Sequence, residues 1–296
     1  MRVTTAMTYQ RMILNLNTKT EDAGRLANMI ATGKRLGKPQ EDPRAWSQAM
    51  DLRQGLREIE TFQENLDFAI TWNQTTVNTL NSFAGFLDQA MQIGNAALTN
   101  TEDRAQQIQS VDLICQQALD LANTRYAGRY LFSGRSLSTP PFDENLDYQG
   151  GTGDEADFEI RTGPDNRQVI NITGEAAFIV DSSDPDESNV LKMLQALKTA
   201  LEDEDMTEVQ NQITALEGAR DHITGQNTLA GLRMSYFDGQ KSALEALKTN
   251  SKDRLAELED ADTAEAIILM QQNQTALQAA LQATAMLDDL NLAKFL

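Results

Sequence analysis

Cysteine and histidine are almost absent from this sequence of 296 residues, and their scarcity removes whole classes of chemistry. With Cys115 as the sole cysteine, an internal disulfide and a thiolate-bound metal cluster are both excluded. With His222 as the sole histidine, a site built from several histidines is excluded as well. The sequence also lacks a glycine-rich nucleotide loop and an H-E-x-x-H helix. We therefore expect no enzyme, no cofactor and no metal site, and we expect both residues to be structural.

Aromatic side chains and long apolar runs are also scarce. No stretch approaches the roughly 20 apolar residues that cross a bilayer, so membrane insertion is not expected. The opening residues Met1–Met7 lack the apolar run of a secretory signal, and composition alone predicts a cytosolic protein. Aromatic residues make up only 6% of the chain, whereas Ala, Leu, Gln and Asn are abundant. This composition favours long helices that contact other helices.

Positive charge is scarce in most of the chain. The formal net charge of −19 argues against nucleic acid and anionic membranes as partners. Residues 1–44 nevertheless hold eight basic and four acidic side chains, whereas residues 136–190 hold thirteen acidic side chains, two arginines and no lysine. The acidic spacing matches no EF-hand loop, so solvated carboxylates are expected there rather than a calcium site. The two regions are therefore expected to have different surroundings.

Helical periodicity is the dominant positive signal. Asp42 and Pro43 are a favourable N-cap and first helical residue, and apolar residues then recur at helical spacing from Ala45 to about Leu98. This pattern predicts one helix of about 55 residues, whereas helices of compact domains average about 11. Further helices are predicted before about residue 31, from Thr101 to about Tyr130, from about Asn189, after a capping box at Thr207 and Gln210, and from Asp262 to about Leu290.

Residues 136–188 have a different character, because four of the six prolines and most of the acidic excess lie there. Period-two alternation at Asp157–Arg161 and Gln168–Ile172, on either side of the turn Gly163–Asn166, predicts a β-hairpin. Ala177–Val180 is expected to add a third strand. A small β-rich insert is therefore predicted within a helical chain.

These elements predict a mainly α fold. It is a long antiparallel helical bundle or coiled coil with paired N- and C-terminal helices and a small β-rich insert. The predicted domains are a terminal helical domain, a long-helix bundle and an acidic insert. They span residues 1–40 with 260–296, residues 41–135 with 189–259, and residues 136–188.

Apolar stripes run along both ends of the chain and should pack against each other. Lys19 interrupts the N-terminal stripe, and Gln274 interrupts the C-terminal one. Two interpretations remain open: the terminal helices complete a bundle within the monomer, or they are mobile there and become buried among neighbouring subunits. The residues predicted to pack between subunits are Met12, Leu16, Leu26, Ile30, Ile267, Met270, Leu277, Leu281 and Leu287.

Five motifs occur in order along the chain. They are MRVTTAMTY at the start, ATGKRL at 31–36 followed by EDPRA at 41–45, GRYLFSG at 128–134 followed by PPF at 140–142, DTAEAI at 262–267, and LNLAKFL at 290–296. Together they resemble the hook-associated protein 3, or hook–filament junction, family of the flagellin superfamily. Flagellins carry a different run after the first loop, so Asp42–Pro43 and GRYLFSG favour the junction family.

The resemblance implies a structural role in the bacterial flagellum. Members of this family form a ring between hook and filament, after hook-associated protein 1 and before flagellin polymerises. Their terminal helices form the inner tubes, and their insert faces outward. The resemblance also implies export of the unfolded chain through the flagellar type III channel without a cleaved signal, so the expected location becomes extracellular. A cytoplasmic export chaperone is expected to bind the C-terminal region.

Three alternatives are compared with this interpretation. The chain could be a flagellin-like filament subunit, which would have the same structural class. It could be a secreted helical adhesin or effector that binds through the insert, and its termini would then stay ordered in a monomer. A helical-bundle enzyme would need a Glu-x-x-His pair from each of two helices, and the single histidine excludes that form.

Overall fold

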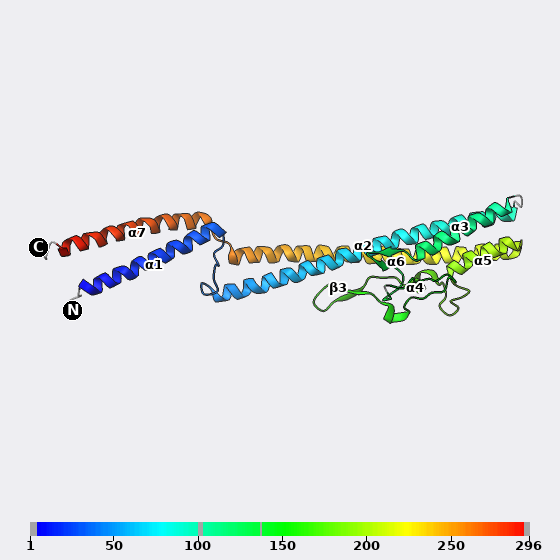
Figure 1. The fold of residues 1–296 in the computed structure, drawn as a ribbon, viewed down its shortest axis with the longest axis horizontal. Coiled ribbons are helices and arrows are strands. Elements are labelled where there is room, and N and C mark those ends of the chain that lie inside the picture. Colours follow the sequence, from blue (N-terminus) through cyan, green and yellow to red (C-terminus); the bar gives the residue numbers. More distant parts are fainter. Residues whose placement is uncertain (1–4, 100–102, 137, 293–296) are drawn as a thin grey trace. The chain divides into compact units, whose positions relative to one another are not determined.

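The computed structural model describes residues 5–99, 103–136 and 138–292, with the side chains of residues 5, 6, 8, 9, 154, 155 and 287–292 outside this description. Most of these residues are helical, which confirms the predicted fold class (Figure 1). The helices are α1 (Thr5–Thr32), α2 (Pro43–Thr99), α3 (Arg104–Ala122), α4 (Gly174–Phe178), α5 (Val190–Glu202), α6 (Met206–Glu259) and α7 (Thr263–Leu292). The short elements are strands β1 (Arg125–Tyr126), β2 (Arg129–Tyr130), β3 (Glu159–Arg161) and β4 (Arg167–Val169), and the 3-10 helix η1 (Gly153–Ala156).

The chain divides into two compact units. Unit 1 consists of residues 1–58 and 246–296, and unit 2 consists of residues 59–245. Helices α2 and α6 are continuous through the boundary, so each contributes one part to each unit.

The long helix α2 begins where the sequence predicts. Asp42 Oδ1 accepts a hydrogen bond of 3.0 Å from the backbone N–H of Ala45, which satisfies one of the amides left free at a helix start. Pro43 takes the first helical position, where its missing N–H costs nothing. The helix then runs for 57 residues, in agreement with the predicted length of about 55.

In unit 2, α2 and α6 lie side by side and run in opposite directions. Four polar contacts join them, and the residue number on α6 falls as the number on α2 rises. The pairs are Gln63 with Glu245, Asp67 with Lys241, Asn81 with Asn227, and Asp88 with Arg220. An antiparallel long-helix bundle is therefore present in this unit.

Side chains of the 136–188 segment share one core with these helices. Phe178 is fully buried, and its ring centroid lies 4.7 Å from that of Phe83 on α2. Phe132 and Phe142 contact the same ring edge-on, at 5.0 Å and 5.6 Å. Few aromatic residues occur in the chain, but several of them meet at this point and fasten the segment to the bundle.

The chain after α3 differs from the prediction. A helix to about Tyr130 was expected, but α3 ends at Ala122, and β1 pairs with β2 in a tight hairpin. Its two central residues, Ala127 and Gly128, have φ values of 50° and 79°. Such a turn matches the twist of a hairpin, and the glycine favours it without steric cost. The prediction was wrong because it relied on the spacing of apolar residues, which does not reveal this turn.

The prediction for residues 157–180 is correct in part. The hairpin is confirmed, with Glu159 paired to Val169 and Arg161 paired to Arg167. The third strand at Ala177–Val180 is wrong, because Ala177 and Phe178 belong to α4. Thr173 caps this helix by accepting a hydrogen bond of 3.1 Å from the N–H of Ala176.

The start of α6 also differs from the predicted capping box. The cap is Asp205 rather than Thr207, since Asp205 Oδ1 accepts hydrogen bonds of 3.0 Å from the N–H groups of Thr207 and Glu208. A carboxylate at a helix N-terminus also gains from the helix dipole. The predicted cap at Thr101 lies outside the described residues.

Candidate subunit interface

Helices α1 and α7 lie side by side in unit 1, as the terminal stripes predict (Figure 1). The N-terminus of α7 is capped by Asp262, whose Oδ1 accepts hydrogen bonds from the N–H groups of Ala264 and Glu265 at 2.9 and 3.1 Å. Helix α1 ends at Thr32, and the next residue, Gly33, has a φ of 69°, a conformation that glycine adopts without steric cost. Both helices therefore have defined boundaries at one end of the pair.

The seam of this pair follows a heptad pattern on both helices. Its α7 positions are the buried or half-buried residues Ala266, Met270, Asn273, Leu277, Ala280 and Thr284, at spacings of four and three. Its α1 positions follow the same spacing and include Met12, Leu16, Lys19, Ala23, Leu26 and Ile30, of which Lys19 alone is exposed. The seam is therefore narrow, and small or polar residues fill four of the six α7 positions.

The residues predicted to pack between subunits fall into different environments. Leu26 is buried in the seam, and Met12, Leu16, Ile30, Met270 and Leu277 are half-buried beside it. Ile267 and Leu281 lie one position past the seam and are exposed. The side chain of Leu287 lies outside the described residues.

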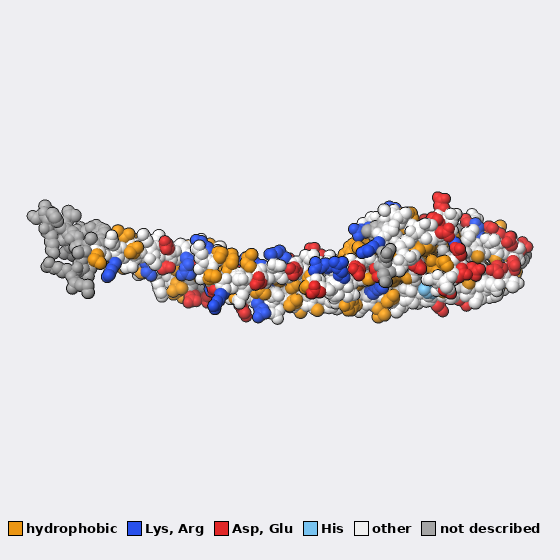
Figure 2. Space-filling view, turned by 90° about the horizontal axis from the view of Figure 1, so that it is seen from below, with side chains coloured by type: hydrophobic (Ala, Val, Ile, Leu, Met, Phe, Trp, Pro, Cys, Tyr) orange, Lys and Arg blue, Asp and Glu red, His pale blue; other side chains and the backbone are white. Residues whose placement is uncertain are grey.

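Further apolar residues on this pair were missed by the sequence analysis. Ile13, Leu14, Ile268 and Leu269 are exposed, and Figure 2 shows hydrophobic side chains exposed along the terminal helices on the face drawn. The run from Ile267 to Met270 could have indicated them, since four consecutive apolar residues place apolar side chains on every side of a helix. From Ala266 to Leu287 the sequence of α7 contains no charged residue. A helix with this surface is suited to burial on more than one side.

A buried carboxylate ties the terminal helices to the ends of the long ones within unit 1. The Glu259 side chain is 4% exposed, and its two oxygens lie 2.8 Å from Lys34 Nζ and 2.7 Å from Arg53. Backbone hydrogen bonds from Arg35 N–H to Glu259 O, 2.6 Å, and from Ala261 N–H to Gly33 O, 2.9 Å, cross the same place. We call this set of contacts the joint.

The electrostatics of the joint favour the charged form of Glu259. Burial alone would raise the pKa of this carboxyl, but the hydrogen bonds from Lys34 and Arg53 and their charges outweigh it, and the pKa is lowered. Glu259 is therefore ionised at neutral pH and bridges two cations that come from the 33–42 loop and from α2.

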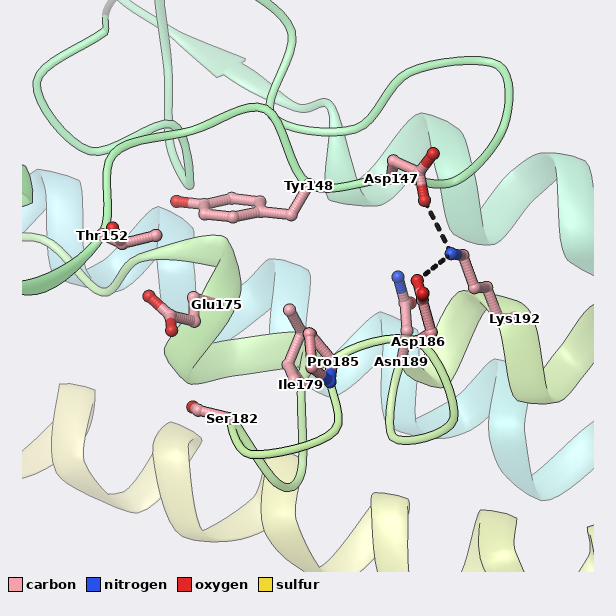
Figure 3. Close-up of a pocket in the computed structure, with 10 residues that line it drawn as sticks. All are labelled: Asp147, Tyr148, Thr152, Glu175, Ile179, Ser182, Pro185, Asp186, Asn189 and Lys192. Atoms are coloured by element: carbon pink, nitrogen blue, oxygen red, sulfur yellow. Dashed lines mark hydrogen bonds and ion pairs between the residues drawn. The ribbon is translucent and has the colours of Figure 1, made fainter.

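A cleft of about 270 Å³ lies beside α5 in unit 2 (Figure 3). Lys192 Nζ lies 2.6 Å from an oxygen of Asp147 and 2.6 Å from an oxygen of Asp186, and these hydrogen bonds raise the lysine pKa. Burial raises the pKa of Tyr148 to about 12, and its hydroxyl donates to backbone carbonyls. Lys192 and Tyr148 therefore keep their protons near neutral pH, and their hydrogen bonds hold the loops together.

Metal sites, membrane-spanning helices and the single histidine were also considered among the described residues. There, no group of three or more His, Cys, Asp or Glu side chains is placed to hold a metal ion. Within the same residues, no helix is long and apolar enough to cross a membrane. His222 Nε2 lies 2.8 Å from the carbonyl oxygen of Ala176, which joins α6 to α4.

Comparison with known proteins connects these features to a family. Residues 3–136 match the bacterial flagellin N-terminal helical region, and residues 213–296 match its C-terminal helical region. Flagellar hook-associated protein 3 of Escherichia coli K12 is 27% identical over an alignment of 318 residues, which covers 99% of this chain and 98% of that protein.

Solved structures agree with this result. The crystal structure of FlgL from Bacillus cereus has a TM-score of 0.59 at 25% identity and covers 69% of this chain and 98% of its own. The flagellar junction protein FlgL from Legionella pneumophila has a TM-score of 0.58, covers 72% of this chain and 100% of its own, and is 15% identical, so it supports the fold alone. Both terminal helical regions of bacterial flagellin are matched, so the chain belongs to the flagellin superfamily, and within it the chain is similar to hook-associated protein 3 along nearly the whole length of both chains.

Proposed function

We propose that this chain is a structural, non-enzymatic subunit of the bacterial flagellum that assembles with copies of itself into a ring between hook and filament. Flagellin then polymerises on this ring. The observation that carries the proposal is the surface of α7, which has no charged residue from Ala266 to Leu287 and leaves Ile267, Ile268, Leu269 and Leu281 exposed. An uncharged helix surface with several large apolar side chains exposed is typical of a protein-interaction surface.

The α1–α7 pair is hard to stabilise without further contacts. Its seam buries few large side chains, and helices in proteins gain most of their stability from packing of an apolar face against other elements. Packing against the same helices of neighbouring subunits would bury Ile13, Leu14, Ile268 and Leu269 as well. This supports the second interpretation of the terminal stripes, in which assembly completes their burial.

The three domains predicted from the sequence take separate roles in this proposal. Residues 1–40 and 260–296 form the polymerisation domain, residues 41–135 and 189–259 form the bundle, and residues 136–188 form the outward insert. The proposed partners are further copies of the chain, hook-associated protein 1, flagellin and a cytoplasmic export chaperone. Export through the flagellar type III channel is consistent with a chain that has a single cysteine and hence no internal disulfide to unfold.

Deletion of the gene tests the proposal directly. Electron microscopy of the deleted cells is combined with a blot of cells and medium for flagellin. Hooks without filaments, with flagellin shed into the medium, are the expected result. Intact filaments on the deleted cells would overturn the proposal.

The same experiment examines a second candidate, a filament subunit, which the matches to both flagellin helical regions favour. In that case the deletion removes the filament protein itself. The blot would then detect no flagellin in the cells or in the medium.

A further inference from the structure

A groove in unit 2 lies between the edge of β4 and the outer side of α6. Its volume is about 390 Å³. Leu232 on its rim is 64% exposed, and Tyr236 beside it is exposed as well, whereas Phe237 is buried. The lining residues are Arg167, Gln168, Val169, Leu232, Arg233, Tyr236 and Phe237. Large apolar side chains at the rim of a groove indicate a docking surface.

Two arginines give this groove a charge opposite to that of the chain. Arg167 is largely exposed and lies 3.9 Å from Glu159, a long and weak ion pair. Arg233 donates one hydrogen bond to the carbonyl oxygen of Asn171, and burial lowers its pKa. Two guanidinium groups at an apolar groove favour a segment with carboxylates and some apolar surface.

The chain itself contains such a segment at residues 180–187. Asp181, Asp184, Asp186 and Glu187 are all exposed, the segment contains no basic residue, and Val180 and Pro185 add apolar surface. Figure 2 shows acidic side chains crowded at the end of unit 2 that holds α5. We call residues 180–187 the acidic loop.

The acidic loop is already held in one conformation. The N–H of Val180 donates a hydrogen bond of 3.0 Å to Ser188 O, and Asp181 Oδ1 accepts from the N–H and hydroxyl of Ser183. Asp186 is anchored by Lys192, as Figure 3 shows. A preformed loop loses less conformational entropy when it binds.

The loop lies too far along α6 to reach the groove of its own chain. The hydrogen bond between His222 and Ala176 fixes the level of α4, which leads into the loop. The groove begins ten residues further along α6, at Leu232. At 1.5 Å per residue the separation is on the order of 15–20 Å. The loop therefore fits the groove of a second copy displaced along the helix axis by about that distance.

We propose that the acidic loop of one subunit docks in the β4–α6 groove of its neighbour, so that Arg167 and Arg233 face Asp184 and Glu187. The inference rests on the proposed assembly of identical subunits. Rings and helices of identical chains use heterologous contacts, in which every chain contributes two different, complementary surfaces. The groove and the loop are such a pair within unit 2, separate from the terminal helices.

Cross-linking between engineered cysteines tests the contact in assembled junctions. In a Cys115→Ala background, Ser182→Cys and Leu232→Cys are combined in one chain, and cells carrying filaments are treated with a short bis-maleimide. A ladder of dimers, trimers and larger species is expected. Each single-cysteine variant should remain monomeric, because a heterologous contact never brings two identical positions together. Filaments that form normally without a ladder would overturn the inference and leave the proposed function standing.

Charge reversal supplies a second test that does not depend on cross-linker reach. Arg167→Glu and Asp184→Lys should each reduce the number of filaments per cell by roughly five- to tenfold, as expected for loss of about 1 kcal/mol in a repeated contact. The double variant should recover most of that loss. Arg135→Glu, a reversal at an exposed arginine outside the groove, is the matched control.

The outcomes of the charge-reversal test distinguish the acidic loop from other possible occupants of the groove. Losses without recovery in the double variant would mean that the groove binds a partner other than this chain, which overturns the inference. Unchanged filament numbers in both single variants would also overturn it. Failure of the proposed function itself is recognised by a separate result, namely filaments that persist when the gene is deleted.

Discussion

The side-chain amide of Asn273 donates a hydrogen bond of 3.0 Å to the backbone carbonyl oxygen of Lys19, in the middle of the α1–α7 seam. Asn273 is 6% exposed, and its Oδ1 has no hydrogen-bond partner within the described residues. A single polar residue in a heptad seam fixes the register of two helices at a cost in stability. This layer therefore limits the pair to one alignment while keeping it weak.

Replacing Asn273 by leucine should stabilise the α1–α7 pair. The change removes a buried oxygen without a partner, which is worth about 1–3 kcal/mol, and adds apolar volume to the seam. Hydrogen exchange of the α1 and α7 amides should become slower in the monomer. Gln272→Leu, at the exposed neighbouring position, is the control and should leave exchange unchanged. Faster exchange in Asn273→Leu would contradict this account of the seam.

The joint should weaken in acid because of Glu259. Its folded-state pKa lies below the ordinary value of 4.5, so its contribution to stability is complete above that value and is lost as the pH falls through the folded pKa. Denaturant unfolding followed by circular dichroism should therefore show a loss of stability as the pH falls below about 4.5 that Glu259→Gln lacks. At neutral pH this variant should be less stable by only about 1 kcal/mol, because the two cations that it leaves unpaired, Lys34 and Arg53, are 46% and 34% exposed and remain solvated.

An equal loss of stability in the wild type and in Glu259→Gln across that pH range would argue against the joint as its source. Lys34→Met provides a second check. It removes one of the two cations, so it should shift the acid-induced loss to higher pH.

Leu281→Asp should block incorporation into the flagellum without unfolding the monomer. Leu281 is 52% exposed, so a charge there should change the free energy of unfolding by less than about 0.5 kcal/mol. In the assembly, the same carboxylate would be buried without a partner. Filament counts by electron microscopy and thermal unfolding of the purified chain are the two measurements. Leu113→Asp on α3, where the leucine is 54% exposed, is the matched control. Normal filaments from Leu281→Asp would exclude this face as an interface.

Cys115 should react slowly with thiol reagents in the native chain. Burial, together with the nearby Asp112 carboxylate, raises the pKa of its thiol to about 11. The thiolate is the reactive form, so its population at neutral pH falls by roughly 100-fold relative to a thiol of pKa 9. Alkylation followed by mass spectrometry should show slow modification that becomes fast in denaturant. Rapid native labelling would indicate that α3 opens readily from the bundle.

The long helices were predictable because their caps and apolar spacing are local features. Asp42, Pro43 and Asp262 act at their helix starts as the sequence indicates. The α1–α7 seam was only partly predictable. A search for large apolar residues selects Ile267 and Leu281, whereas the seam contains Ala266 and Ala280, which let the helices approach closely. Alanine carries too little hydrophobic signal to be distinguished from surface alanine.

The β-rich segment was less predictable because tertiary contacts decide its local structure. Phe178 lies in an apolar run that fits a strand, but it packs between Phe83, Phe132 and Phe142 from a single helical turn. The β4–α6 groove could not be predicted at all, since its two sides lie about 65 residues apart in the sequence. The hairpin β3–β4 was predicted because its turn residues and alternation are adjacent.

The absence of charge along α7 means that salt should act differently on the two proposed contacts. A contact made by Ala266–Leu287 has no ionic attraction to screen, and sulfate or phosphate salts should strengthen it by favouring apolar burial. The contact between the acidic loop and the groove relies on exposed carboxylates and guanidinium groups, and physiological ionic strength already screens such pairs beyond about 8 Å. Raising the salt concentration would therefore weaken the proposed contact between the acidic loop and the groove, while the proposed contact through α7 holds.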